Sequence, residues 1–347
     1  MSEVAVHVVR GGLVESRHHL SLAICTPSGE LLASCGNPER LTFWRSAAKP
    51  VQLLPLVAAG GAEHFGFTAH ELAVMAGSHS GEKPHVEAVQ SILRKIGLDQ
   101  EHLRCGIHTP SSRAAAEELA RSGRAPSQLH CNCSGKHAAM LALAVLKGWP
   151  TAGYIEMNHP VQQEMLAVVA AVTGVPAEVI PVAVDGCGVV TFMISLRAMA
   201  QAYARLATGE ELPRAPGWRE AAARVSEAMR THPHMVAGTG QLVTSLMAAT
   251  GGRLVVKSGA EGLICVGLPE RAWGLALRIE DGSSRAVGPA VIELLRRLGA
   301  VSDEEAGSLA DWHRPEIRNF SGRVVGLIEA VFPEPLAAAL ARLRAGL

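Results

Sequence analysis

Three residues of this sequence, Ser46, Lys49 and Lys257, have the types and spacing that nucleophilic catalysis requires. A serine hydroxyl is almost entirely un-ionised at neutral pH, so it attacks effectively only when a neighbouring base removes its proton. Residues three apart lie on one face of a helix, and Ser46 and Lys49 are therefore expected to be neighbours. If Lys257 lies nearby, its charge disfavours the protonated form of Lys49 and keeps that amine basic.

The S-x-x-K spacing of Ser46 and Lys49, together with residues 257–259 (KSG), is similar to the motif pair S-x-x-K and K-T-G of β-lactamases and penicillin-binding proteins. Serine replaces the threonine of the second motif and keeps its hydroxyl. A serine at a helix start is usually an N-cap, so S-x-x-K alone is weakly specific. The joint occurrence favours catalysis and points to an amide-bond hydrolase.

Composition favours a small-molecule partner. Lysine plus arginine and aspartate plus glutamate number 32 each, so no global field attracts nucleic acid or an acidic membrane. No apolar run approaches the length of a membrane span. The first residues (MSEVAVH) have neither the basic nor the apolar region of a signal peptide, and the seven cysteines suit a reducing compartment. These features predict a cytoplasmic protein.

The periodicity predicts an α+β fold. Alternating β-branched residues predict strands near the N-terminus, and further strands return late in the chain. Apolar residues at helical spacing predict that about residues 60–250 are mostly helical. We therefore expect one domain, residues 1–347, with an antiparallel sheet from both chain ends and a helical layer or lobe beside it. The predicted strands are residues 4–9, 19–26, 31–35, 254–257, 263–268 and 272–279.

Two further segments contain chemically useful side chains. Residues 77–82 (GSHSGE) supply a second hydroxyl, Ser78, although a helix C-cap and turn explains the same composition. Cys133 and Cys187 lie in separate polar or glycine-flanked segments and could hold a soft metal such as zinc, with buried packing as the alternative. The zinc deaminase pattern and the phosphate-binding loop are both missing.

Six short segments resemble, in order, the motifs of the L-asparaginase II family of the rhizobial type. They are residues 43–50 (FWRSAAKP), 78–82 (SHSGE), 133–137 (CSGKH), 159–162 (HPVQ), 185–188 (DGCG) and 257–262 (KSGAEG). The resemblance covers nearly the whole chain. It implies a β-lactamase-like fold, a homodimer, and hydrolysis of L-asparagine to L-aspartate and ammonia.

The resemblance also implies the site residues. It implies two catalytic pairs, Ser46 with Lys49 and Ser78 with Lys257. It implies a zinc site with the ligands Cys133, Lys136 and Cys187. The substrate-binding residues are then Arg45, Asp185 and His137. The sequence leaves open which serine attacks, and the S-x-x-K analogy favours Ser46.

Two positions depart from the family pattern. Val189 and Val190 follow DGCG where the family usually has a proline, and Gln241 stands where an arginine is expected. These departures concern substrate affinity and selectivity rather than the reaction class. Two alternatives stay open: a related serine amidohydrolase acting on glutamine or a β-lactam, and a non-catalytic, zinc-dependent binding protein for a small molecule.

Overall fold

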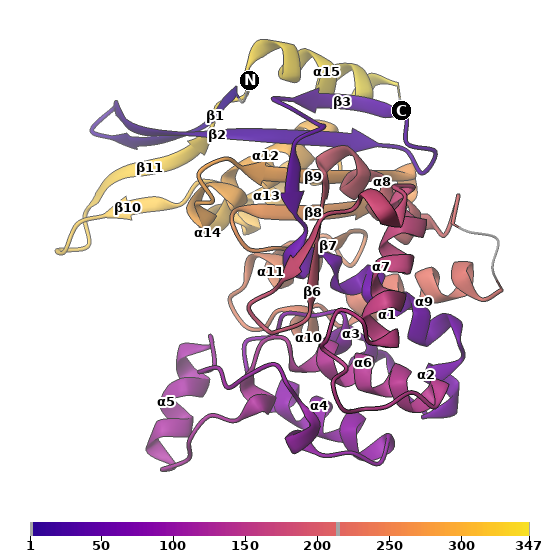
Figure 1. The fold of residues 1–347 in the computed structure, drawn as a ribbon. Coiled ribbons are helices and arrows are strands. Elements are labelled where there is room, and N and C mark those ends of the chain that lie inside the picture. Colours follow the sequence, from indigo (N-terminus) through magenta and orange to yellow (C-terminus); the bar gives the residue numbers. More distant parts are fainter. Residues whose placement is uncertain (1–2, 213–215, 347) are drawn as a thin grey trace.

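The main sheet is assembled from both ends of the chain (Figure 1). The computed structural model describes residues 3–212 and 216–346. Within these residues the sheet has eight strands in the order β10-β11-β1-β2-β9-β8-β7, with β3 paired to β2. All of its pairings are antiparallel. The strands are β1 (Glu3–Arg10), β2 (Leu13–Cys25), β3 (Leu31–Cys35), β7 (Val255–Ser258), β8 (Leu263–Leu268), β9 (Trp273–Ile279), β10 (Glu316–Arg318) and β11 (Val324–Ala330).

Helices cover both faces of this sheet, which explains the uniformly apolar strand β8 (LICVGL), buried at every position. Helix α8 (Leu196–Thr208) packs on β2, β8 and β9, and α12 (Val287–Leu298) packs on β8, β9 and β11. Gly274 allows α8 to approach closely, since a Cβ there would lie 1.9 Å from Ala200 O. The last helix, α15 (Glu334–Ala345), contacts α12 and β3.

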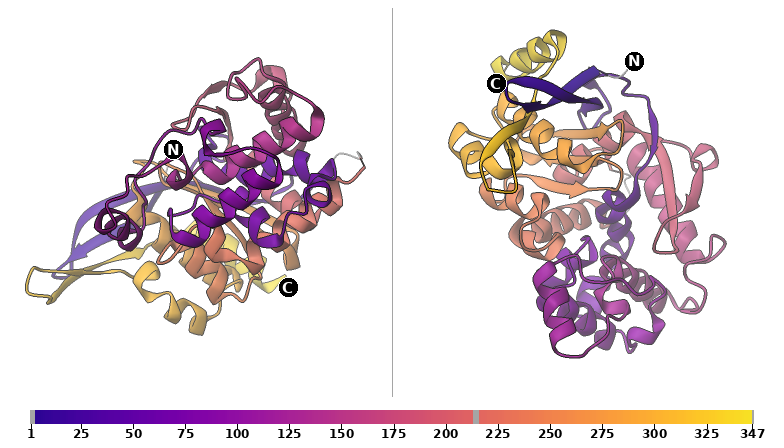
Figure 2. Two further views of the ribbon diagram at one scale, coloured as in Figure 1. Left: turned by 90° about the horizontal axis from the view of Figure 1, so that it is seen from below. Right: turned by 90° about the vertical axis from the view of Figure 1, so that its left-hand side faces the viewer.

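A helical lobe lies beside the sheet, as the two views of Figure 2 show. Its central helix, α1 (Lys49–Ala58), is buried over nine of its positions and contacts α6, α7 and α9. Pro50 is in the first turn of α1, where the missing amide costs little. The other helices of eight or more residues here are α4 (Lys83–Lys95), α5 (Arg113–Arg121), α6 (Ser134–Lys147), α7 (Pro160–Thr173), α9 (Trp218–Thr231) and α11 (Leu242–Ala249).

A second, small sheet joins the chain just before Ser46 to residues 182–195. Its three described strands have the order β4-β6-β5, namely β4 (Leu41–Phe43), β6 (Val190–Ser195) and β5 (Val182–Val184). The backbone N–H of Trp44 extends this pairing by donating to Phe192 O at 2.8 Å. The small sheet therefore holds the chain before Ser46 against the segment that contains Asp185.

The predicted fold class is confirmed, because strands from both chain ends form one antiparallel sheet with helices around it. The sequence missed the strands β10 and β11 near the C-terminus and did not predict a sheet within residues 60–250. Strands β5 and β6 are only three and six residues long, and their pairing with β4 depends on tertiary contacts. Among the described residues, no helix is long and apolar enough to cross a membrane.

Candidate active site

Ser46 lies in a short 3-10 helix, Arg45–Ala48, that leads directly into α1. Two aromatic residues hold this turn: Trp44 is fully buried, and the Tyr203 hydroxyl donates to Ala47 O at 2.7 Å. Arg45 has φ of 51°, a left-handed conformation that side chains other than glycine's rarely adopt. Backbone strain of this kind occurs mainly at functional sites, where surrounding structure maintains it.

The amines of Lys49 and Lys257 meet at the hydroxyl of Ser78. Lys49 Nζ donates to Ser78 Oγ at 2.7 Å, and Lys257 Nζ donates to the same oxygen at 2.9 Å. Lys49 also contacts Asn132 O at 3.3 Å, and Lys257 contacts Ser258 O at 2.9 Å. The backbone N–H of Lys49 donates to Ser46 O, but within the described residues no hydrogen bond joins the Lys49 amine to the Ser46 hydroxyl.

Burial and charge make one of these lysines a base. Each lysine is only 1% exposed, so two full positive charges around one oxygen would be costly. Burial, followed by the positive charge of Lys49, lowers the pKa of Lys257 well below its usual value. The like-charge effect expected from the sequence thus acts on Lys257. A neutral Lys257 amine can accept the proton of the Ser78 hydroxyl.

Arg45 and Asp185 form an ion pair beside Ser46. Arg45 Nε donates to Asp185 Oδ1 at 2.7 Å, and the side chains are 30% and 8% exposed. The backbone N–H of Gly186 donates to the same carboxylate oxygen at 2.8 Å and orients it. The pair therefore places one positive and one negative group next to the candidate nucleophile.

His137 is fully buried and has one free ring nitrogen. The Tyr154 hydroxyl accepts from Arg104 N at 2.9 Å and lies 2.6 Å from His137 Nδ1. Donation to Nδ1 is the arrangement that gives the buried hydroxyl proton an acceptor. Burial, followed by the charge of Lys136, lowers the pKa of His137 to about 3. The proton of the neutral ring is therefore on Nε2, which lacks a hydrogen-bond partner among the described residues. A buried, unpaired donor of this kind suits a ligand or a water molecule.

The three expected metal ligands come together in the structure. Lys136 Nζ donates to Cys187 Sγ at 3.1 Å, and the Cys133 thiol is hydrogen-bonded to those of Cys131 and Cys187. The Cys131 and Cys187 bonds, opposed by burial, hold the pKa of Cys133 well below its usual value. Burial lowers the pKa of Lys136, but the electrostatic influence of Cys133, followed by Cys187 and Asp185, raises it above its usual value.

The donor set fits zinc only with Lys136 included. Within the described residues, no group of three or more His, Cys, Asp or Glu side chains is arranged to hold a metal ion. Two sulfurs and one amine nitrogen are soft to borderline donors, which zinc accepts once the amine is deprotonated. Two neighbours missed by the sequence reasoning, Cys105 and Cys131, extend the thiol cluster.

Two glycines explain why the segment of residues 131–137 lies near Ser78. A Cβ on Gly135 would lie 2.2 Å from Val74 O, so the start of α6 approaches the end of α3 (Ala69–Met75) with no space for a side chain. A Cβ on Gly77 would lie 2.8 Å from both Met235 O and Val236 O. These close approaches place the start of α6 against the end of α3, and residues 235–236 against the chain just before Ser78.

A cavity of about 510 Å³ elsewhere contains none of these residues. It lies around Glu293, whose carboxylate binds Arg296, Arg297 and His313 at 2.7 to 3.0 Å. Burial by itself would raise the pKa of Glu293, but these hydrogen bonds hold that pKa far below its usual value. This network links α12 to α14 (Ala310–His313) and has a structural explanation in those ion pairs.

The sequence matches the family model for L-asparaginase II over residues 6–330. The chain belongs to the L-asparaginase II family. Membership makes the protein an amidohydrolase that acts on a small-molecule amide. A search of curated proteins gives no significant match.

Several solved structures are similar to this family member at low identity. A β-lactamase from Mycobacterium bovis has 12% identity and a TM-score of 0.37, covering 76% of this chain and 88% of that chain. A putative β-lactamase from Bacteroides dorei DSM 17855 has 14% identity and a TM-score of 0.37, with 84% and 92% covered. Mglu in its tris and glutamate form has 18% identity and a TM-score of 0.33, with 77% and 56% covered. Likeness at this level says nothing of the substrate.

Proposed function

We propose that this L-asparaginase II family protein hydrolyses L-asparagine to L-aspartate and ammonia through a serine acyl-enzyme. The observation that carries the proposal is the contact of two buried lysine amines, Lys49 and Lys257, with the hydroxyl of Ser78. Lys49 is three residues after Ser46, at the start of α1, and its amine contacts the Ser78 hydroxyl. This arrangement can move a proton from an attacking serine to a leaving amine.

The Arg45–Asp185 pair supports an amino-acid substrate. L-asparagine carries an α-carboxylate and an α-ammonium group, which are complementary to the guanidinium and the carboxylate of this pair. Because Arg45 directly precedes Ser46, a substrate held there has its side-chain carboxamide within reach of the Ser46 hydroxyl. The free Nε2–H of His137 supplies a further donor for a substrate oxygen.

In the proposed first step, Lys49 passes its extra proton through the Ser78 hydroxyl to the neutral amine of Lys257. Lys49 then takes the hydroxyl proton of Ser46 as Ser46 Oγ bonds to the carboxamide carbon. The carbonyl π electrons move to oxygen and form a tetrahedral oxyanion, which helix-start N–H groups stabilise. When the oxyanion collapses, the C–N bond breaks, and the proton passes through Ser78 and Lys257 to the departing ammonia. Water then attacks the ester carbon, aspartate leaves, and Ser46 regains its proton.

Cys133, Lys136 and Cys187 would hold zinc in this enzyme. When bound, zinc supplies Lewis-acid charge that orients a substrate group. The side chains themselves bury two sulfurs and an amine on the side of the site that contains His137. We also propose that the protein is a homodimer, which light scattering of the purified protein measures directly.

The decisive experiment incubates purified protein with L-asparagine and measures ammonia and aspartate. Equal amounts of both products are expected, with lower rates on L-glutamine and on a chromogenic β-lactam. Faster hydrolysis of either alternative would change the substrate assignment within the family. Calorimetric binding of asparagine without any ammonia release would support the non-catalytic binding protein instead.

A further inference from the structure

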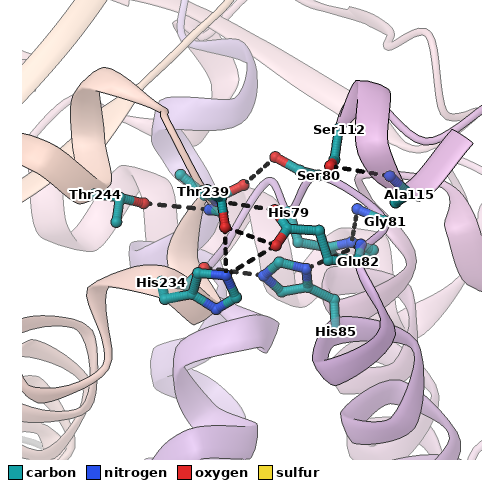
Figure 3. Close-up of polar contacts among 12 residues, drawn as sticks. His79, Ser80, Gly81, Glu82, His85, Ser112, Ala115, His234, Thr239 and Thr244 are labelled. Carbon is teal, nitrogen blue, oxygen red and sulfur yellow. Dashed lines mark hydrogen bonds and ion pairs between the residues drawn. The ribbon is translucent and has the colours of Figure 1, made fainter. Parts of the chain in front are cut away.

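Three histidines and one glutamate fasten the loop of Ser78 to a distant segment of the chain. Figure 3 shows the cluster, which we call the Glu82 clamp: His79, Glu82, His85, His234 and Thr239. The His79 and His85 rings stack at 5.1 Å between centroids, and His85 and His234 stack at 4.8 Å. None of these residues has a role in the mechanism proposed above.

The Glu82 carboxylate binds three donors of one segment. Its Oε1 accepts from Thr239 N at 2.8 Å, and its Oε2 accepts from Thr239 Oγ1 at 2.8 Å and from His234 Nε2 at 3.0 Å. The Glu82 side chain is 15% exposed and His234 is 38% exposed, and Thr239 is exposed, so these bonds lie at the edge of the protein surface. Hydrogen bonds to a charged group contribute more than neutral ones.

The fastened segment is the one that positions Ser78. Val236 O accepts from the backbone N–H of Ser78 at 2.7 Å, and Ala237 O accepts from Ser80 Oγ at 2.6 Å. Gly238 has φ of 118°, and a Cβ there would lie 2.4 Å from Ser80 Oγ and 2.6 Å from Glu82 Oε1. Alternate residues of the Ser78 loop thus contact one short segment: Ser78 contacts Val236, Ser80 contacts Ala237, and Glu82 contacts Thr239. The last of these contacts is the one that involves a charged side chain.

The His85 ring fixes the same two segments in its neutral form. Its Nδ1 accepts from the backbone N–H of Glu82 at 3.2 Å, and its Nε2–H donates to His234 O at 2.9 Å. A proton on Nδ1 would face an N–H donor, so this bonding requires the neutral ring. The carboxylate of Glu82 is the charged group that bonds to Thr239. Its removal leaves Thr239 N without its acceptor and leaves Thr239 Oγ1 only the contact with His234 Nε2 at 3.2 Å.

We propose that Glu82 is a positioning residue for catalysis, acting through residues 236–239 on the hydroxyl of Ser78. This inference rests on the proposed asparagine hydrolysis for its kinetic part. Ser78 relays a proton and does not anchor the substrate, so its displacement slows the chemical step while leaving substrate binding nearly unchanged. A misplacement of about 1 Å in a catalytic site can cost roughly 100-fold in rate.

The test compares Glu82→Leu, Glu82→Gln and a matched control in the full-length protein. Glu82→Leu should lower kcat by roughly 10- to 100-fold with KM within about 3-fold of wild type. Glu82→Gln should keep kcat within about 3-fold, since its amide oxygen accepts from Thr239 N and its NH2 can donate to Thr239 Oγ1. Thr239→Val should couple non-additively with Glu82→Leu, because both remove the same contact.

Glu305→Leu is the control, since Glu305 is 18% exposed and also accepts a backbone N–H, from Ser302, but lies outside the clamp. It should lower the melting temperature and leave kcat unchanged. Hydrogen exchange of the Ser78 amide gives a readout that needs no substrate: Glu82→Leu should speed it, and Glu305→Leu should not.

If the Ser78 amide exchanges at the wild-type rate in Glu82→Leu, Glu82 does not hold Ser78 and the proposal is wrong. If the amide exchanges faster but kcat stays at the wild-type value, Glu82 has no effect on catalysis and the proposal is also wrong. If Glu305→Leu loses as much kcat as Glu82→Leu, general destabilisation explains the loss in both variants, and the proposal is wrong. If Glu82→Leu does not fold, the Glu82→Gln and Thr239→Val variants decide by the same two measurements. A wild type that releases no ammonia from asparagine contradicts the proposed function and the kinetic part of this proposal, while exchange still decides whether Glu82 holds Ser78.

Discussion

The amine of Lys49 lies 2.7 Å from the hydroxyl of Ser78, a residue 29 positions later in the chain. Lys257 contacts the same hydroxyl from 179 positions further on. Ser78 is therefore the contact point of the two lysine amines, whereas no side-chain hydrogen bond joins Lys49 to Ser46 among the described residues. This geometry separates the expected effects of the two serines.

The first prediction concerns the attacking serine. Ser46→Ala should leave near-background ammonia release, because no acyl-enzyme can form, whereas Ser78→Ala should lose roughly 100- to 10,000-fold of kcat, the scale of one acid–base group. Mass spectrometry of wild type quenched during turnover should find the aspartyl adduct on the peptide containing Ser46. An adduct on Ser78, or a fully active Ser46→Ala, would show that Ser46 is only part of a helix start.

The second prediction concerns the stability cost of Lys257. Its folded pKa lies below the unfolded value of about 10.4, so between these two values the unfolded state binds more protons and stability rises with pH. Lys257→Met removes the buried amine and should raise the melting temperature at pH 7, with a smaller difference at pH 10. The same variant should lose most activity. Full activity in Lys257→Met would contradict the role of this lysine in proton transfer.

The third prediction concerns substrate anchoring. Asp185→Asn keeps the shape of the pair with Arg45 but removes the charge that faces the α-ammonium group, so KM for asparagine should rise by roughly 10-fold or more. The kcat value should change much less, since neither group takes the reaction proton. Steady-state kinetics separates the two. A lower kcat at unchanged KM would place this pair in the chemical step.

The fourth prediction concerns metal. Protein purified without chelator should contain about one zinc per chain, and the Cys133→Ala, Cys187→Ala double variant should contain none. Elemental analysis measures both. Since zinc is proposed to orient the substrate, its loss should raise KM more than it lowers kcat. Unchanged metal content in the double variant, or metal-free wild type with full activity, would make these cysteines structural.

The fifth prediction concerns acid stability. Glu293 has a lowered folded pKa, so its contribution is present above the unfolded value of about 4.3 and is lost as pH falls through the folded pKa. Glu293→Gln should cost roughly 2 kcal/mol in free energy of unfolding at pH 7 and progressively less below pH 4. Glu117→Gln, at an exposed helix pair with Arg113, is the control and should change stability by under about 0.5 kcal/mol. An equal difference at pH 3 and pH 7 would contradict this account.

Local patterns determined most secondary structure and the type of chemistry. Apolar periodicity placed helices such as α7 and α12 and strands such as β8 within a few residues, because each must bury one face or both. The S-x-x-K spacing and the KSG and SHSGE segments named Ser46, Lys49, Ser78 and Lys257 before any geometry was known. These signals reside in side chains close together in sequence.

Tertiary structure decided how those residues meet. The Arg45–Asp185 pair joins residues 140 positions apart through the small sheet of β4, β5 and β6, whose short strands carry too little periodicity to predict their pairing. Tyr154 and Thr239 lie in irregular segments, so no local pattern identified them as partners of His137 and Glu82. The lowered pKa of Lys257 depends on burial and on a second amine, and both arise only when distant segments pack together.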